Sequence, residues 1–325
     1  MNIYEVLKPF PGARGGFALF CIIGDEIYFL PHFLKHYRSL GVTEFHFLVD
    51  RSTDGSLEFL LEQPDCAVIT SRYKFKDRLR LRIAGETIER RFADISRFLV
   101  PRDFFMGRWG LVVDADEFLI LPKEFSGLDS FVNHLDRHGL NSCRAVMVDF
   151  YPAKLADLDR HDRSENPFRI APYYDLVPID WPDLALRPVK LHHEVSVRSR
   201  INARLIECHP QLSDHLKDGA PVMLHKVPLL RWDKGTIILD AHTANHTPSN
   251  LVQVALAHFK FFPGWERKVT GALQEKQYAR NSVKYRPLAY ARQLLSDWPL
   301  CNDATQQISL NDRTIHRQLA FDLLA

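Results

Sequence analysis

The sequence predicts an α/β fold in which a mostly parallel sheet of nucleotide-binding type is flanked by helices. Two observations predict it. Apolar runs such as 17–23 and 111–113 are short and end beside Gly or Asp, which is typical of strands buried on both faces of a sheet. Amphipathic stretches with helical spacing lie between such runs, and strands that alternate with helices form parallel sheets with helical crossovers.

The N-terminal part shows this alternation most clearly. The run 17–23 is the expected first central strand. A helix follows that begins near Pro31 and stops at Gly41, because proline is tolerated in a first helical turn and glycine favours a helix end. The order then continues with a strand at 44–50, a helix that ends at Leu61 and a strand at 66–70.

Residues 72–91 form a strongly basic stretch, with eight Lys or Arg and three Asp or Glu. Apolar and aromatic residues, among them Tyr73, Phe75 and Leu79, are interleaved with the charges. We interpret this stretch as a merely solvated helix face. The alternative is a basic amphipathic surface that could meet phosphate, a polyanionic glycan or anionic lipid. From 88 to 99 the spacing is helical and leads to Pro101.

Beyond 111–113 the sequence predicts both regular and irregular segments. Prolines interrupt 152–200, which suits an irregular segment that faces a substrate. The other expected elements are a helix at 127–135, strands at 145–151 and 189–197, a hairpin of 221–232 with 235–242, and amphipathic helices within 265–298 and 308–324.

Composition excludes several classes of protein. A formal net charge of +2 argues against a dedicated nucleic-acid-binding protein. The five Cys residues are scattered without a C-x-x-C spacing, so neither a disulfide framework nor a zinc site is expected. The first residues lack a signal-peptide pattern, and no apolar run approaches the roughly 20 residues that span a bilayer. We expect a cytoplasmic protein, with peripheral association at the inner membrane face left open.

The acidic cluster Asp114, Asp116 and Glu117 directly follows the strand at 111–113. Open α/β sheets bind ligands at the carboxyl ends of their strands. Three carboxylates so close together repel one another, and beside a buried strand they require a cation or hydrogen-bond donors. A hard divalent ion is the natural partner. Two further predicted strands also end in aspartate, at Asp50 and Asp149, which predicts one polar rim.

Taken together, these motifs resemble the family-2-like glycosyltransferases of bacterial surface-polysaccharide pathways, which have the GT-A fold. The resemblance covers most of 17–290, and the order and spacing of its motifs are more specific than the acidic cluster alone. The matching stretches are 24–26, 37–41, 50–56, Trp109 with 114–118, 148–151, 226–232, His242 and 258–261.

The resemblance implies a hexosyltransferase-like enzyme that moves a sugar from a nucleotide-diphosphate sugar to a glycan or lipid-linked saccharide. A UDP-sugar is the expected donor. Mn²⁺ or Mg²⁺ would bridge the acidic cluster and the diphosphate, with Asp114, Asp116 and His258 as its protein ligands. The residues expected to contact the base, the ribose or the diphosphate are Asp50, Asp114, Lys226, Arg231 and Lys260.

The resemblance also implies inversion at the anomeric carbon, in a single displacement that needs one general base for the acceptor hydroxyl. Asp149 is the first candidate for that base and Asp175 the second. The chain then divides into 1–150, which binds the nucleotide-sugar, 151–262, which forms the acceptor side of the same domain, and 263–325, a C-terminal helical extension.

Three other functions remain open from the sequence. A metal-dependent phosphohydrolase also places D-x-D after a strand, but normally after the first strand of the chain. A nucleotidyltransferase would need a basic, glycine-rich loop after that strand, whereas the turn 24–26 is acidic. A non-catalytic glycan- or membrane-binding protein on a transferase scaffold would tolerate the loss of Asp114 and Asp116.

Overall fold

The computed structural model describes residues 3–12, 15–83, 86–175, 196–216, 225–238, 240–245, 253–275 and 279–308. The chain divides into two compact units. The first comprises Met1–Phe118, Glu124–Ala145 and Lys226–Gln253, and the second comprises Leu119–Lys123, Val146–His225 and Val254–Ala325. The segment Lys226–Gln253 therefore belongs with the N-terminal residues, although it is distant from them in sequence.

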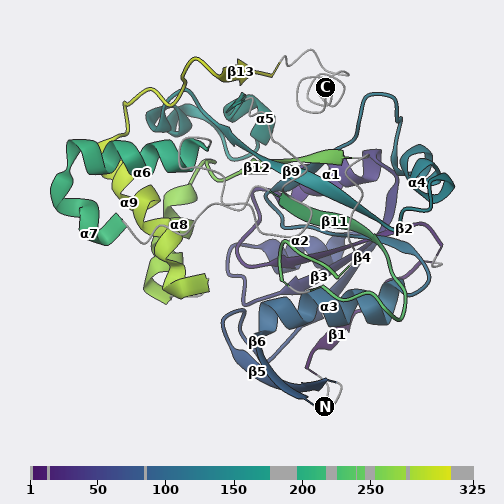
Figure 1. Cartoon of the computed structure of the whole chain (residues 1–325). Helices are drawn as coiled ribbons and strands as arrows, with labels where there is room; N and C mark the ends of the chain where they lie inside the picture. The colour runs from purple at the N-terminus through teal and green to yellow at the C-terminus, as the bar shows by residue number, and fades with distance from the viewer. Residues whose placement is uncertain are drawn as a thin grey trace. The chain divides into compact units, whose positions relative to one another are not determined.

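A mixed sheet with a parallel core forms the centre of the first unit (Figure 1). Its strands lie in the order β1-β4-β3-β2-β7-β11. The four central strands β4, β3, β2 and β7 are parallel to one another, whereas β1 pairs antiparallel with β4 and β11 pairs antiparallel with β7. These strands are β1 (Glu5–Lys8), β2 (Phe17–Ile23), β3 (Val42–Val49), β4 (Cys66–Thr70), β7 (Trp109–Val112) and β11 (His225–Arg231). The α/β class with a mostly parallel core is thereby confirmed.

Helices cover both faces of this sheet. They are α1 (Leu30–Ser39), α2 (Ser56–Glu62), α3 (Phe92–Phe105) and α4 (Leu128–Arg137). Leu48 of β3 belongs to the apolar cluster that includes Phe92 and Ile95 of α3. Its neighbour Phe47 instead meets Phe33 of α1, with ring centroids 6.0 Å apart. Because successive side chains of a strand point to opposite faces, α1 and α3 cover opposite faces of the sheet.

The sequence predicted most of these elements and failed at the basic stretch. The strands expected at 17–23 and 66–70 are confirmed as β2 and β4. The interpretation of 72–91 as a helix face is wrong, because the chain there forms an antiparallel hairpin of β5 (Arg78–Ile83) and β6 (Glu86–Arg91). The helix predicted from 88 begins only at Phe92 and continues past Pro101. In β5 the sequence Arg-Leu-Arg-Leu-Arg-Ile alternates with the period of a strand. The interpretation as a helix face gave more weight to the high charge density than to this alternation.

The hairpin expected from 221–232 and 235–242 is also wrong. β11 pairs with β7 instead, with Leu229 opposite Leu111. In the second predicted strand Ile238 makes an isolated bridge with Ala244. The backbone N–H and C=O groups of the buried strand β11 form hydrogen bonds with β7, a central strand that is distant in sequence. Spacing along the sequence does not reveal this pairing.

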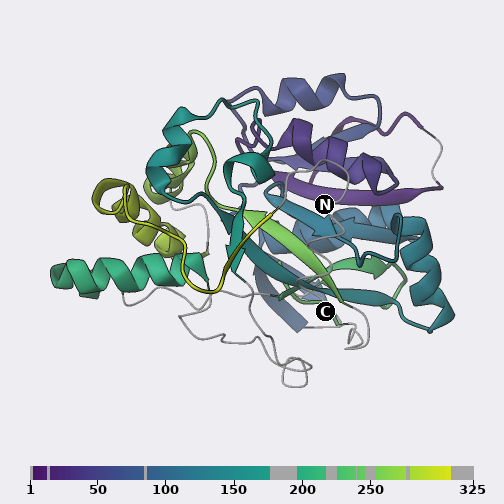
Figure 2. The same ribbon diagram turned by 90° about the horizontal axis from the view of Figure 1, so that it is seen from above.

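The second unit combines strands with a group of helices. β10 (Tyr173–Asp175) pairs antiparallel with β9 (Ser142–Tyr151) and with β13 (Thr305–Gln307). β12 (Gln253–Phe259) pairs with β9 and with β8 (Glu117–Ile120). The helices are η1 (Leu155–Arg160), α5 (Pro167–Ile170), α6 (Val197–Cys208), η3 (Pro210–Leu212), α7 (Ser213–Leu216), α8 (Trp265–Glu275), η4 (Ala279–Tyr285) and α9 (Arg286–Leu294). Figure 2 shows α6 beside the yellow-green helices of the C-terminal part; α6 packs against α9, and α9 packs against α8.

The helices expected within 265–298 are confirmed as α8, η4 and α9. The strand expected at 189–197 lies outside the described residues up to 195, and its last residue begins α6. The helix expected at 308–324 lies outside them from 309 onwards. Among the helices that the structure describes, none is long and apolar enough to cross a membrane.

Candidate functional site

The acidic cluster lies at the carboxyl end of β7, in the first unit. All four residues of β7 are buried. The strand runs parallel to β2, and the next residue, Val113, donates its backbone N–H to the carbonyl oxygen of Phe20 at 3.2 Å. The chain runs from β2 outward to β3 and β4 and then returns to the other side of β2 as β7. The ends of β2 and β7 are therefore a topological switch point, where open α/β sheets bind ligands.

A buried ion pair organises this cluster. Lys226 Nζ donates to Glu117 Oε2 at 2.6 Å and lies 3.5 Å from Asp114 Oδ2. The side chains of Lys226 and Glu117 are only 2% and 1% exposed. Burial raises the pKa of Glu117 to about 7, against the opposing charge of Lys226. Burial alone would lower the pKa of Lys226, but the carboxylates of Asp114 and Glu117 outweigh it and raise that pKa.

The register of β11 explains how Lys226 reaches the acidic cluster. Leu229 pairs with Leu111 in the antiparallel contact of β11 with β7. If the same register continues for three more residues, from Leu229 back to Lys226, then Lys226 lies opposite Asp114. The structure therefore places Lys226, the first residue of the motif 226–232, beside the carboxylates of the acidic cluster.

Arg97 of α3 is a second cation in the cluster, and the sequence did not predict it. Its Nη2 donates to Asp114 Oδ1 at 2.8 Å. Its buried Nε has no hydrogen-bond partner among the described residues. A signal existed in the sequence, because Arg97 is a lone charge between Ile95 and Phe98 in an apolar helical pattern. Two of the donors that the acidic cluster requires are thus side chains of the protein, and the backbone N–H of Asp114 also donates, to Glu117 Oε2 at 2.9 Å.

Asp50 lies at the carboxyl end of β3, but its carboxylate is engaged by the backbone. The N–H of Phe75 donates to Asp50 Oδ2 at 3.0 Å. Burial raises the pKa of Asp50, and the hydrogen bond from Phe75 offsets part of that rise. In the structure Asp50 holds the segment before β5, and its predicted contact with a base or ribose stays a prediction.

The two loops that follow β2 and β3 are tied together by side chains. Asp25 Oδ1 accepts a hydrogen bond from the backbone N–H of Thr53 at 2.6 Å. The N–H of Glu26 donates to Ser56 Oγ at 3.0 Å, and the N–H of Ile27 donates to Asp54 Oδ2 at 2.9 Å. Asp25 adopts a φ of 55°, in the left-handed region that L-residues rarely use. The matching motif 50–56 therefore builds a fixed rim beside the acidic cluster.

Arg231 does not lie with the acidic cluster. It pairs with Trp109, the first residue of β7, and so lies at the other end of that strand from Asp114. Its Nη1 is 3.4 Å from Asp136 Oδ1 of α4. The structure thus brings Lys226 to the acidic cluster and leaves Arg231 with α4.

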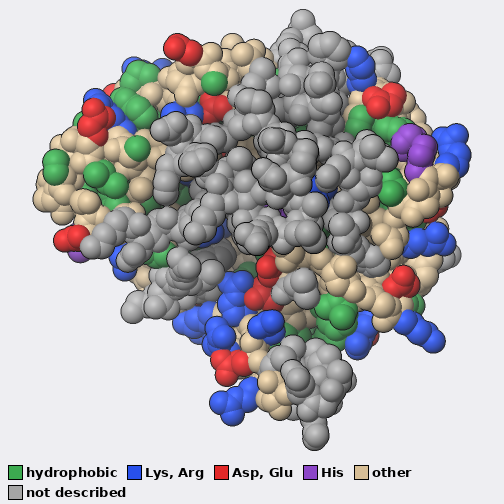
Figure 3. Space-filling view, viewed as in Figure 1, with side chains coloured by type: hydrophobic (Ala, Val, Ile, Leu, Met, Phe, Trp, Pro, Cys, Tyr) green, Lys and Arg blue, Asp and Glu red, His purple; other side chains and the backbone are tan. Residues whose placement is uncertain are grey.

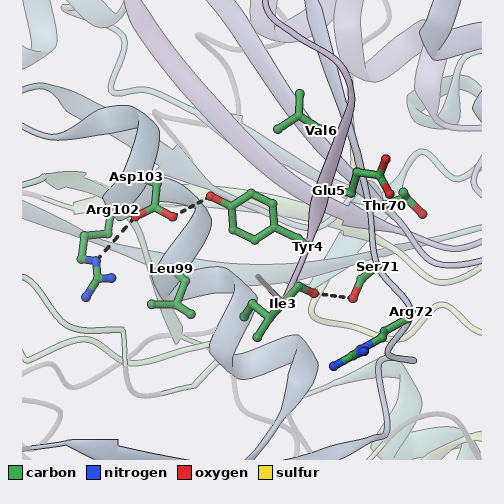
Figure 4. Close-up of a pocket in the computed structure, with 10 residues that line it drawn as sticks. All are labelled: Ile3, Tyr4, Glu5, Val6, Thr70, Ser71, Arg72, Leu99, Arg102 and Asp103. Atoms are coloured by element: carbon green, nitrogen blue, oxygen red, sulfur yellow. Dashed lines mark hydrogen bonds and ion pairs between the residues drawn. The ribbon is translucent and has the colours of Figure 1, made fainter. Parts of the chain in front are cut away.

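A cavity of about 850 Å³ lies elsewhere in the first unit, and the acidic cluster does not line it. Figure 4 shows Tyr4 pointing toward Asp103, whose Oδ2 accepts a hydrogen bond from the Tyr4 hydroxyl at 2.6 Å. Arg102 lies 3.8 Å from the same carboxylate. Asp103 already has these partners, so its charge in the cavity is balanced. We therefore do not assign the candidate functional site to this cavity.

The first candidate base, Asp149, is enclosed by two partners within the second unit. Arg198 Nε donates to Asp149 Oδ2 at 2.8 Å, and His258 Nδ1 lies 2.6 Å from Asp149 Oδ1. Burial alone would raise the pKa of Asp149, but the charge of Arg198 and the hydrogen bond from His258 hold it well below its usual range. The carboxylate is therefore ionised and accepts both hydrogen bonds, and it is a weak proton acceptor.

The second candidate base, Asp175, has a similar set of partners. Its carboxylate is paired with Arg200 and accepts a hydrogen bond from the Tyr151 hydroxyl. Thr305 Oγ1 lies 3.3 Å from Asp175 Oδ1. Lys260, which directly follows β12, is half-buried. Asp149 and Asp175 are thus held in ion pairs of the second unit, and His258 is hydrogen-bonded to Asp149. The predicted roles of these three residues toward a substrate stay predictions.

A metal site made only of protein ligands is not assembled among the described residues. No group of three or more His, Cys, Asp or Glu side chains is placed there to hold a metal ion. Asp114 and Asp116 offer two carboxylates, and Asp114 is 34% exposed. Mg²⁺ usually binds through one or two carboxylates together with substrate phosphates. The residues therefore fit a divalent ion that arrives with a diphosphate.

Comparison of the chain with models of known protein families gives no match, and comparison with the curated proteins gives none either.

Proposed function

We propose that this protein is a glycosyltransferase of the GT-A type that transfers a sugar from a nucleotide-diphosphate sugar to a glycan or lipid-linked acceptor. The acidic cluster carries the proposal, because it lies at the switch point of the parallel sheet with two cations, Lys226 and Arg97, beside it. The residue order that resembles family-2-like enzymes supports the same reaction.

The leaving group explains why cations belong at this position. The bond between the anomeric carbon and the diphosphate oxygen breaks, and negative charge grows on the diphosphate. In this proposal Arg97 and Lys226 stabilise that charge, and the buried Nε of Arg97 is a donor that a phosphate oxygen would satisfy. A divalent ion held by Asp114 and Asp116 would neutralise further charge on the leaving group when bound.

The acceptor hydroxyl must lose its proton as its oxygen bonds to the anomeric carbon. Asp149 remains our candidate for the base by its place near the carboxyl end of β9, and Asp175 is the second. The ion pairs of both carboxylates would have to open toward an acceptor, since a base needs hydrogen-bond reach of the hydroxyl. A single displacement with this base inverts the anomeric carbon.

Release of a nucleoside diphosphate tests the proposed reaction. We expect slow release from one member of a panel of nucleotide-sugars in Mn²⁺, and its loss in EDTA. The variant Asp116→Asn keeps the size of this buried side chain and should lower the rate at least about a hundredfold, because several kcal/mol of charge stabilisation are lost.

A matched control is Asp129→Asn, which changes an exposed carboxylate of α4 in the same unit. Its rate should stay within about twofold of the wild type, as is usual for surface substitutions. Equal release by Asp116→Asn and the wild type would contradict the site, and no release from any donor would favour a binding protein or a phosphohydrolase.

Metal binding should depend on the nucleotide. At neutral pH the carboxylates of the cluster face Lys226 and Arg97, so the charge that would attract a free cation is largely balanced. We expect Mn²⁺ to bind at least about tenfold more tightly when a nucleoside diphosphate supplies phosphate oxygens. By thermodynamic linkage, Mn²⁺ must raise the affinity for the nucleotide by the same factor. Calorimetric titration of the nucleotide with and without Mn²⁺ measures that factor. Equally tight Mn²⁺ binding to the protein alone would contradict this arrangement.

A further inference from the structure

The hairpin of β5 and β6 concentrates the positive charge of the chain. Residues 72–91, which contain it, carry eight basic and three acidic residues, whereas the whole chain has a net charge of only +2. The rest of the chain is therefore net acidic. Figure 3 shows Lys and Arg side chains gathered over β5 and β6.

The basic side chains of the hairpin are presented to solvent. Arg78 and Arg80, which lie on the same face of the hairpin, are 61% and 79% exposed. Arg90 is exposed as well, but it pairs with Leu79 and so lies on the opposite face. Glu89 lies opposite Arg80 and forms ion pairs with both Arg78 and Arg80. One carboxylate thus faces two arginines, and an excess of positive charge remains on this face.

The hairpin is fastened to the core at its base. The N–H of Phe92 donates to the carbonyl oxygen of Asp77 at 2.7 Å, and the N–H of Ala93 donates to that of Phe75 at 3.3 Å. Phe75 and Leu79 pack against the apolar cluster beneath α3. The base of the hairpin is therefore held against the core of the unit.

Apolar side chains are exposed on the neighbouring edge strand. β1 pairs with β4 so that Glu5 lies opposite Thr70, close to where the chain leaves β4 for the hairpin. The next two residues, Val6 and Leu7, are 38% and 50% exposed. Figure 1 shows β1, β5 and β6 at the same end of this unit.

We propose that the β5–β6 hairpin, together with the exposed edge of β1, docks this protein onto an anionic membrane surface. Lys and Arg side chains near a bilayer are attracted to anionic headgroups. Exposed aliphatic side chains gain from the interface between headgroups and acyl chains. A soluble polyanion would meet the arginines but would leave Val6 and Leu7 in water, so the combination favours a lipid surface.

Vesicle binding tests this proposal without any donor sugar, so its failure would leave the proposed transferase reaction untouched. The whole 325-residue chain is mixed with vesicles of phosphatidylcholine alone or with added phosphatidylglycerol. We expect partition into the anionic vesicles, and its decrease at high salt. The variant Arg78→Gln/Arg80→Gln should bind them about thirtyfold more weakly, from the loss of two basic residues near the surface.

The matched control is Lys35→Gln/Arg137→Gln, which removes two exposed basic residues from other helices of the same unit. It should bind anionic vesicles within about twofold of the wild type. Because Arg78 and Arg80 are paired with Glu89, Lys76→Gln lowers the positive charge at the base of the hairpin without removing those ion pairs, and it should also weaken binding to anionic vesicles.

Three outcomes would overturn the proposal. The first is equal binding to neutral and anionic vesicles, and the second is an equal loss in the hairpin and control variants. The third is binding to heparin that depends on Arg78 and Arg80 without any binding to vesicles, which would identify a soluble polyanion instead of a membrane.

Discussion

Replacing Lys226 with Met is expected to lower the free energy of unfolding by about 3–5 kcal/mol, since removing one partner of a buried ion pair leaves the other without compensation. Lys226 is the cation closest to Glu117, and both side chains are almost fully buried. Methionine is similar in length and adds no cavity of comparable size. Urea unfolding followed by circular dichroism measures the loss.

A double variant separates this electrostatic effect from a packing effect. Lys226→Met/Glu117→Gln removes both charges, so it should cost about 2 kcal/mol less than the sum of the two single variants. The more exposed pair Arg38 and Asp65 of the same unit, whose side chains are 38% and 22% exposed, is the control, and Arg38→Met should cost no more than about 1 kcal/mol. Strict additivity of the Lys226 and Glu117 variants would show that the pair does not stabilise the cluster as an ion pair.

The central strands were predictable because their signal is local. The run 17–23 is continuous and apolar, as a strand buried on both faces requires, and β2 has the predicted bounds. The basic hairpin was equally local in its alternation, yet its charges favoured a helix face. Here the period of two residues was the better guide than composition.

The candidate site was only half predictable. Asp114, Asp116 and Glu117 are adjacent in the chain, and their repulsion predicts neutralising partners without saying which. The partners come from α3 and β11, and Lys226 is 109 residues from Glu117. Such a contact depends on the pairing of β11 with β7, which follows from how the sheet is assembled and not from spacing.

Replacing Asp149 with Asn is expected to destabilise the second unit by about 3–5 kcal/mol at pH 7, because Arg198 and His258 lose their shared carboxylate. The control is Asp159→Asn, which removes the more exposed carboxylate paired with Arg292 in the same unit. That variant should cost less than about 1 kcal/mol. Calorimetric unfolding of both variants compares the two ion pairs directly.

The effect of Asp149 should depend on pH with a definite sign. Its pKa in the folded protein is depressed below the value of about 3.9 for an unfolded aspartate. The folded state therefore binds fewer protons at this site, and the carboxylate stabilises the fold fully above the unfolded pKa. As the pH falls below about 4, the stability difference between the wild type and Asp149→Asn should shrink, since the wild-type carboxyl must protonate on approach to its folded pKa. A difference that is unchanged between pH 7 and pH 3 would mean that Asp149 acts through shape and hydrogen bonding, and that its charge contributes little to the stability of the unit.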